Sequence, residues 1–183
     1  MTRIISGSAG GRRLKTPTSG ARPTTDRVRE SLFSNLDHYF GTWEGLRILD
    51  LFAGSGALGL EALSRGAAEA VFVDQARGAI QVIKENLATT RLGPAKVIQA
   101  NAVHWPDSAR GTQFDCVFLD PPYEDAAILV PAAVKNLLDA RLIADDGVVI
   151  TEHPTRTTIA WPANPRDITV RSFGDTSVSR VVW

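Results

Sequence analysis

The sequence predicts an α/β protein with a Rossmann-like, mostly parallel seven-stranded sheet that ends in an antiparallel hairpin, preceded by a small N-terminal β-hairpin extension. Three observations support this fold class. Apolar segments of strand length alternate with helical segments from residue 46 to residue 153, which indicates a parallel sheet covered on both faces. A glycine-rich turn follows the first of these strands. Two β-prone segments around Gly174 close the chain as a hairpin.

The N-terminal region is expected to form a short hairpin followed by a helix. Residues 3–6 and 13–16 are β-prone and flank the pair Gly10-Gly11. Thr24, Thr25 or Asp26 can cap the helix. Apolar side chains then recur every four residues and form one stripe: Val28, Leu32, Leu36 and Phe40.

The rest of the chain supplies the sheet and its covering helices. Parallel strands are expected at residues 46–52, 69–74, 96–100, 114–120 and 148–153. Helices are expected at residues 57–64, 76–88 and 126–138, and Pro131 is expected to kink or delay the last of them. The closing hairpin takes residues 168–173 and 177–183. We therefore divide the chain into a hairpin arm, residues 1–24, and a larger α/β domain, residues 25–183.

Charge is distributed unevenly along the chain. The formal net charge is zero, with 20 Lys and Arg against 20 Asp and Glu. Residues 1–30 carry seven basic and two acidic side chains, so a net charge of +5 there balances −5 in the remainder. A basic arm on an acidic body is typical of a protein whose arm binds a polyanion, the alternative being a solvated tail without a partner.

The composition allows predictions about the cellular compartment and about metal binding. With Cys116 as its one cysteine the chain forms no intrachain disulfide, and no apolar stretch approaches the ~18 residues of a membrane span. No apolar segment of signal-peptide type follows the early basic residues, so we expect a cytoplasmic protein. His38, His104 and His153 are dispersed, which argues against a metal site.

The first motif with chemical meaning is the segment DLFAGSGALG, residues 50–59. It leaves a buried strand and opens a helix, and glycines there let the backbone approach a ligand closely. Asp74 ends the next strand, where a carboxylate accepts hydrogen bonds from ribose hydroxyls. The ligand is therefore expected to contain a ribose, which fits either a nicotinamide cofactor or S-adenosylmethionine.

The second motif, DPPY at residues 120–123, favours S-adenosylmethionine. It follows the fourth strand at the carboxyl edge of the sheet, where open α/β sheets bind ligands. The Asp120 carboxylate and the Pro121 carbonyl are both acceptors and suit the two N–H donors of an exocyclic amine. Tyr123 supplies a ring on which the base can stack. Accepting both protons aims the nitrogen lone pair at a sulfonium methyl group, so positioning does most of the catalysis.

The two motifs together resemble class I S-adenosylmethionine-dependent methyltransferases that act on amino nitrogens of nucleobases. Residues 3–15 (RIISGSAGGRRLK), 22–33 (RPTTDRVRESLF) and 52–66 (FAGSGALGLEALSRG) resemble more specifically the RsmD family. That family comprises bacterial 16S ribosomal RNA guanine-N2 methyltransferases, which modify guanine 966. The resemblance covers almost the whole chain and implies a class I methyltransferase fold, S-adenosylmethionine as cofactor and 16S ribosomal RNA in an assembling small subunit as partner.

The resemblance also implies roles for individual residues. Cofactor binding is implied for the glycine loop, the strand ends and the start of the first helix: Asp50, Phe52, Ala53, Gly54, Ser55, Gly56, Asp74, Gln75, Asn101, Ala102, Thr24 and Thr25. Asp120, Pro121, Pro122 and Tyr123 are expected to hold the target guanine. The charge of residues 1–30 assigns RNA contacts to basic residues of the arm and of the helix that follows it: Arg3, Arg12, Arg13, Lys15, Arg22 and Arg27.

Three alternative functions remain at this stage. A nicotinamide oxidoreductase would use the same glycine loop but leaves the DPPY motif and the basic arm unexplained. A non-catalytic RNA-binding module explains the arm but not Asp50 and Asp74. A DNA adenine or cytosine methylase is the nearest rival, and 183 residues contain no segment that we interpret as a separate target-recognition domain. A monomer is expected because no exposed apolar stripe stands out.

Overall fold

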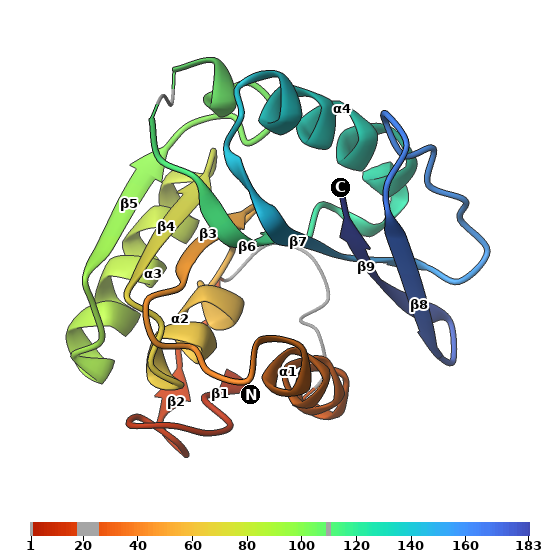
Figure 1. The fold of residues 1–183 in the computed structure, drawn as a ribbon. Helices are drawn as coiled ribbons and strands as arrows, with labels where there is room; N and C mark the ends of the chain where they lie inside the picture. Colours follow the sequence, from red (N-terminus) through yellow and green to blue (C-terminus); the bar gives the residue numbers. More distant parts are fainter. Residues whose placement is uncertain (1, 18–25, 109–110) are drawn as a thin grey trace.

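The computed structural model describes residues 2–17, 26–108 and 111–183, and their main feature is one mixed sheet (Figure 1). The strand order is β5-β4-β3-β6-β7-β9-β8. The parallel strands are β3 (Arg47–Leu51), β4 (Glu69–Asp74), β5 (Ala95–Gln99), β6 (Phe114–Leu119) and β7 (Ile143–Pro154). The closing hairpin, β8 (Asp167–Phe173) and β9 (Thr176–Val182), adds two strands, with β9 antiparallel to β7.

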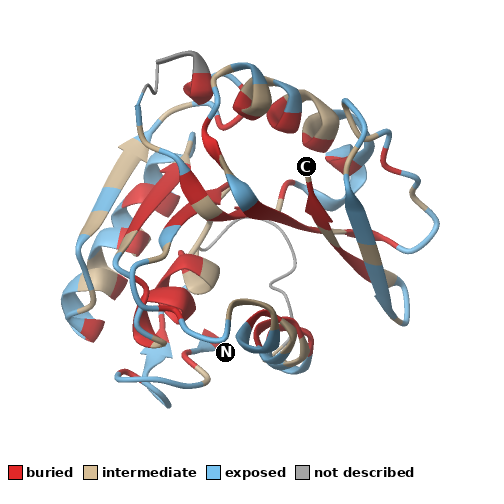
Figure 2. Cartoon of the chain, in the orientation of Figure 1, coloured by how far each residue is buried: buried red, intermediate tan, exposed pale blue. Residues whose placement is uncertain are grey.

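Helices cover both faces of the sheet. On one face lie α1 (Asp26–Phe40), α2 (Ala57–Ser64) and α3 (Arg77–Thr90), and on the other lies α4 (Ala126–Asp139) (Figure 1). Two single 3-10 turns, η1 (Trp105–Ser108) and η2 (Tyr123–Asp125), complete the described helical segments. Each helix buries the side that faces the sheet, whereas β8 at the sheet edge is mostly exposed (Figure 2).

Strand β6 shows why the sequence folds into these layers. Its side chains alternate between the two faces, as the two-residue period of a strand requires. Cys116 and Phe118 pack with α1 and α2, while Val117 and Leu119 pack with α4. All four are fully buried or nearly so, which explains the uninterrupted apolar run. Cys116 is therefore a small core side chain, as the run indicates.

The N-terminal arm forms a shorter hairpin than the sequence predicts. Its strands are β1 (Thr2–Arg3) and β2 (Arg13–Leu14) rather than residues 3–6 and 13–16. The backbone N–H groups of Ile5 and Ser6 donate to the carboxylate of Glu61, and that of Lys15 donates to Oδ1 of Asn86. Side chains of the helices thus accept the backbone N–H groups that would pair between the strands of a longer hairpin.

Apart from the start of β7, the other predicted element bounds agree with the structure to within two residues. Helix α2 and strand β4 have the predicted limits. Strand β7 begins five residues earlier than predicted, with a register shift against β6 between Phe114 and Cys116. Helix α4 begins at the predicted residue and continues through Pro131, so the proline does not delay it. Among the described residues, no helix combines the length and apolar character needed to cross a membrane.

Candidate active site

A cavity of about 840 Å³ lies at the carboxyl edge of the parallel strands. Its wall includes the glycine loop after β3, the end of β4, and the loop after β6. The arm adds Thr2, Thr16 and Pro17 to the wall, and α1 adds Arg29. A cavity at this edge occupies the place where open α/β sheets bind ligands, and its size suits a ligand of several hundred cubic ångströms.

The glycine loop is built around the buried carboxylate of Asp50. Gly56 precedes α2 in a left-handed conformation, and as a glycine it has no side chain that could cap the helix. Instead, Oδ2 of Asp50 accepts the backbone N–H of Gly59 at 2.9 Å, which satisfies one of the free donors at the helix start. A Cβ at Gly59 would lie 2.4 Å from Cε1 of Phe72, so only glycine lets α2 pack this closely on β4.

The Asp74 carboxylate is held at the end of β4 by two backbone donors. Oδ2 accepts the N–H of Gly54 at 2.9 Å, and Oδ1 accepts the N–H of Ala76 at 2.8 Å. An ionised carboxylate has about four lone-pair sites, so each oxygen retains one for a further donor. Asp74 is partly exposed and lines the cavity. It is thus fixed in place and still able to accept hydroxyl groups from a ligand.

The loop after β6 brings Asp120 and Pro122 to the opposite side of the cavity. Pro121 is buried behind them, and Tyr123 is 39% exposed beside the cavity, outside its described lining. The Tyr123 hydroxyl donates to the main-chain oxygen of Asp175 in the β8–β9 turn. That hydrogen bond fixes the ring next to the loop without using its faces.

Asn101 is engaged in closing the turn after β5. Its Oδ1 accepts the backbone N–H groups of Val103 and His104 at 3.0 and 3.3 Å. Its Nδ2 lies 3.5 Å from Oε1 of Gln75. Asn101 itself is outside the described cavity lining, whereas Gln75 and Ala102 are part of it. The amide oxygen therefore sets the shape of this turn.

The electrostatics of the cavity are dominated by carboxylates. Asp50, Asp74, Asp120 and Asp125 line it, and Arg29 is the one basic side chain in its described lining. Burial raises the pKa of Asp50 well above its usual value, and nearby Asp120 and Asp74 raise it further, although the Gly59 N–H opposes the shift. Such a surface favours a ligand that carries positive charge.

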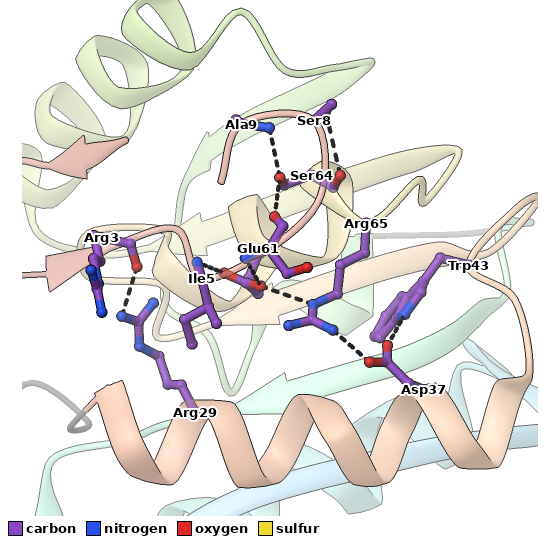
Figure 3. Close-up of polar contacts among 11 residues, drawn as sticks. Arg3, Ile5, Ser8, Ala9, Arg29, Asp37, Trp43, Glu61, Ser64 and Arg65 are labelled. Carbon is purple, nitrogen blue, oxygen red and sulfur yellow. Dashed lines mark hydrogen bonds and ion pairs between the residues drawn. The ribbon is translucent and has the colours of Figure 1, made fainter. Parts of the chain in front are cut away.

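The arm is attached to the body of the protein by buried polar groups (Figure 3). Glu61 on α2 is fully buried and accepts from Ile5, Ser6 and Nε of Arg65. Ser64 Oγ donates to the carbonyl of Ser6 and accepts the Ala9 N–H. The arm is therefore docked on α2, with its ends beside the cavity.

The basic side chains that the sequence assigns to RNA contacts, in the arm and at the start of α1, differ in their polar partners. Nη1 of Arg12 donates to the carbonyls of Thr89 and Thr90 at the end of α3, and Lys15 pairs with Glu85 at 2.7 Å. Nε of Arg3 lies 3.5 Å from Asp26. Arg13 and Arg27 are exposed, and neither side chain has a polar partner within the described ranges. Arg22, Thr24 and Thr25, which the sequence also singles out, fall outside those ranges.

The structure gathers most of the predicted cofactor and base residues around one cavity. Those in its lining are Asp50, Phe52, Ala53, Gly54, Ser55, Asp74, Gln75, Ala102, Asp120 and Pro122. Gly56 is buried beneath the loop. Within residues 2–17, 26–108 and 111–183, no group of three or more His, Cys, Asp or Glu side chains is arranged to hold a metal ion.

Sequence reasoning missed three polar residues that shape the site: Arg29, Glu61 and Asn86. Each is at most 2% exposed and lies on the buried face of its helix. The signal was present in the spacing, because Arg29 precedes Leu32, Phe33 and Leu36 on the apolar face of α1. A charged side chain at a core-facing position needs a specific partner, and that requirement marks it as structural or functional.

Comparison with known proteins identifies the family. A family model described as "Conserved hypothetical protein 95" matches residues 2–182. The chain is 43% identical over 151 residues to "Ribosomal RNA small subunit methyltransferase D" of Escherichia coli K12, covering 82% of this chain and 73% of that protein. It belongs to the RsmD family. The Haemophilus influenzae protein of the same name is 35% identical over 166 residues, with coverage of 88% and 83%.

Solved structures confirm the fold of this RsmD-family member. A hypothetical protein from Thermus thermophilus superposes with a TM-score of 0.85 at 34% identity, and the match covers all of both chains. The parallel strands, the antiparallel end strands and the N-terminal hairpin correspond to the predicted class I methyltransferase fold. The protein described as "Putative methyltransferase yhhF from Escherichia coli" superposes with a TM-score of 0.83 at 38% identity, over 98% of this chain and 96% of that chain, so the cavity lies on a methyltransferase scaffold.

Proposed function

We propose that this chain transfers a methyl group from S-adenosylmethionine to the exocyclic N2 amine of a guanine in 16S ribosomal RNA, at guanine 966 as the family resemblance implies. One observation carries the proposal: Asp120 lines the same cavity as the glycine loop and Asp74. The proposed base acceptor and the proposed nucleoside site therefore face one cavity. The name of the Escherichia coli relative, a small subunit ribosomal RNA methyltransferase, supports RNA as the substrate class.

The residues of the cavity fit S-adenosylmethionine. Asp74 retains free lone pairs for the ribose hydroxyls. Gly54 has φ +56°, and a Cβ at this position would meet only the carbonyl oxygen of Phe52 within 4 Å, so its bare backbone lets a ligand approach closely. Asp50 supplies negative charge for the sulfonium and the α-amino group. When bound, this cofactor supplies a methyl group on a positively charged sulfur, which makes the methyl carbon electrophilic.

Asp120 and its loop are proposed to position the guanine amine for attack. The Asp120 carboxylate accepts one N–H and the Pro121 carbonyl accepts the other, so the nitrogen lone pair points at the methyl carbon. The bound cofactor would supply the methyl carbon to this nitrogen, with the electron pair of the broken C–S bond left on sulfur. The methylated nitrogen then releases a proton to solvent. Tyr123, held through its hydroxyl by Asp175, stacks on the base.

The arm is proposed to bind the phosphates around the target base. Arg13 and Arg27 are exposed cations, and Thr16 and Pro17 bring the arm to the cavity rim. The guanine must be splayed out of any helix, because Asp120 reaches only an accessible amine. We propose an assembling small subunit in the cytoplasm as the natural substrate, and a monomeric enzyme.

Nucleoside mass spectrometry tests the proposed function. The purified chain is incubated with S-adenosylmethionine that carries a deuterated methyl group and with small subunits, or their naked 16S RNA, from cells that lack the gene. Labelled N2-methylguanosine at position 966 supports the proposal. Label in N6-methyladenosine or N4-methylcytosine would overturn the guanine assignment, and label in no nucleoside of either substrate would overturn the proposal as a whole.

A further inference from the structure

Arg29 is a buried cation with unused hydrogen-bonding capacity. It lies in the first part of α1 and is 1% exposed. Its Nη2 donates to the carbonyl of Arg3 at 2.8 Å and to Oδ1 of Asp26 at 2.6 Å (Figure 3 shows the contact with Arg3). Its Nε and Nη1 are buried and have no partner within the described parts of the chain. Buried charged donors without acceptors are costly, so they indicate a missing acceptor.

The unused donors belong to a side chain of the cavity wall. Arg29 lines the cavity together with Asp50, Asp74 and Asp120, and no other basic residue is part of the described lining. A cavity lined by carboxylates alone would suit a ligand that carries only positive charge. This cavity has one arginine beside four aspartates, so it suits a ligand that carries both positive charge and one carboxylate.

The packing of α1 places Arg29 on the β6 side of the cavity. Phe33, one turn after Arg29, packs on Phe118 of β6 with ring centroids 5.7 Å apart. Asp120 follows β6 two residues after Phe118. Asp74 ends β4, and β3 lies between β4 and β6. A ligand that places its ribose at Asp74 and extends across β3 therefore has its other end at Arg29.

We propose that Arg29 binds the carboxylate of the methionine part of S-adenosylmethionine through Nε and Nη1. The inference rests on the proposed function, since it concerns the cofactor that the methyl transfer requires. In this arrangement Asp74 holds the ribose, Asp50 faces the cationic centre, and Arg29 neutralises the carboxylate. Charge-assisted hydrogen bonds from a guanidinium to a carboxylate are among the stronger polar contacts in proteins.

A pair of ligands isolates the carboxylate. S-adenosylmethionine and decarboxylated S-adenosylmethionine differ in that group alone, and calorimetry measures both dissociation constants on the wild-type chain and on two variants. Arg29→Gln removes the charge at similar length, and Arg65→Gln is the matched control. Arg65 is also largely buried and ion-paired, with Glu61 and Asp37, but it lies outside the described lining of the cavity. Thermal unfolding of each variant reports its structural cost.

We expect Arg29→Gln, and not Arg65→Gln, to lose the preference for S-adenosylmethionine over the decarboxylated ligand. Wild type and Arg65→Gln should bind S-adenosylmethionine about 10- to 100-fold more tightly than the decarboxylated ligand, the range for a hydrogen bond to a charged group. Arg29→Gln should bind both ligands within about threefold of each other, through weaker binding of S-adenosylmethionine alone.

Three other outcomes contradict the proposals separately. If wild type does not discriminate between the ligands, the carboxylate is not recognised and the inference about Arg29 fails, even if Arg29→Gln does not fold. If Arg29→Gln weakens both ligands equally, Arg29 only supports the arm and the inference again fails. If wild type binds neither ligand, the proposed function itself fails.

Discussion

Asn86 and Ser55 are joined by a hydrogen bond of 2.9 Å, in which the side-chain Nδ2 donates to the main-chain oxygen of the glycine loop. The same side chain pairs with both backbone groups of Lys15, accepting its N–H and donating to its oxygen. Asn86 is 2% exposed on α3. One buried amide therefore connects the arm, a helix and the loop proposed to hold the cofactor.

Asn86→Ala should destabilise the fold and loosen the glycine loop. The change leaves the carbonyl of Ser55 and the backbone of Lys15 without this partner, so the free energy of unfolding should fall by roughly 1–3 kcal/mol. Urea titration measures that loss, and affinity for S-adenosylhomocysteine should fall as well. Thr89→Ala on the exposed face of α3 is the control. Equal stability of the two variants would show that the amide link contributes little.

Asp74→Ala should weaken cofactor binding without unfolding the protein. The variant removes the acceptor that two backbone N–H groups hold in place for the ribose, at an expected loss of roughly 1–3 kcal/mol of binding free energy. Calorimetry with S-adenosylhomocysteine gives the value. Asp115→Ala is a suitable control, because Asp115 accepts the Arg47 N–H at the other end of β3. An unchanged dissociation constant in Asp74→Ala would remove Asp74 from the site.

Arg13→Glu should weaken RNA binding and reduce its salt dependence. The side chain is exposed, so the change should cost little stability while it removes about one phosphate contact. Arg12→Glu should in addition lower stability, because Arg12 holds the carbonyls of Thr89 and Thr90. RNA binding at several salt concentrations measures the effect, with Lys135→Glu on α4 as control. If the RNA dissociation constant changes neither with salt concentration nor with Arg13→Glu, the phosphate-binding role of the arm is refuted.

The raised pKa of Asp50 makes the free energy of unfolding depend on pH. A carboxyl group whose pKa is higher in the folded than in the unfolded state stabilises the fold at low pH, and that contribution is lost as pH rises through the folded-state pKa. Asp50→Asn keeps an oxygen for the Gly59 N–H but does not titrate. The stability of wild type relative to Asp50→Asn should therefore decrease from below pH 3.8, the usual value, toward neutral pH.

Denaturant titrations of both proteins across this pH range measure the difference. A relative stability that is constant with pH, or that increases as pH rises, would contradict the assigned direction. Binding adds a second readout, because a cationic ligand favours the ionised carboxylate. Affinity for S-adenosylmethionine should decline in wild type as pH is lowered through the raised pKa, and it should show a flatter profile in Asp50→Asn.

The sequence predicts the sheet and its motifs well because their signals are local. The strand β4 and the helix α2 have the predicted limits, since apolar period and turn residues define them. The arm is where local reasoning fails. Its strands end early because Glu61, about 55 residues away along the chain, takes the N–H groups of Ile5 and Ser6. No pattern within residues 1–17 contains that information.

The contrast between local signals and long-range contacts also applies to the residues of the candidate site. Asp50 lies near the end of a predicted strand and Asp74 and Asp120 end theirs, so the parallel sheet alone brings them to one edge. Arg29 and Asn86 reach the cavity and its loop through helix packing instead. Their role depends on how α1 and α3 rotate against the sheet, which the hydrophobic stripe defines only approximately.

Asp120→Ala should show that this carboxylate is the main catalytic side chain. The variant removes the charged acceptor that orients the guanine amine, and the loss of one preorganised electrostatic contact typically lowers turnover by roughly 10²–10³-fold. Asp120→Asn retains a carbonyl oxygen in the same place and should lose less, because an amide accepts the same N–H without the charge. Affinity for S-adenosylhomocysteine should change little in either variant if the carboxylate faces the base.

Single-turnover methyl transfer to small subunits separates the chemical step from product release. Cofactor titration on the same preparations separates an effect on the chemical step from an effect on cofactor binding. Asp125→Ala provides a control, since Asp125 also lines the cavity but follows the DPPY motif. Near-normal methyl transfer by Asp120→Ala would show that the DPPY segment is a structural turn. A loss of cofactor affinity equal to the loss of rate would instead assign Asp120 to the cofactor side of the cavity.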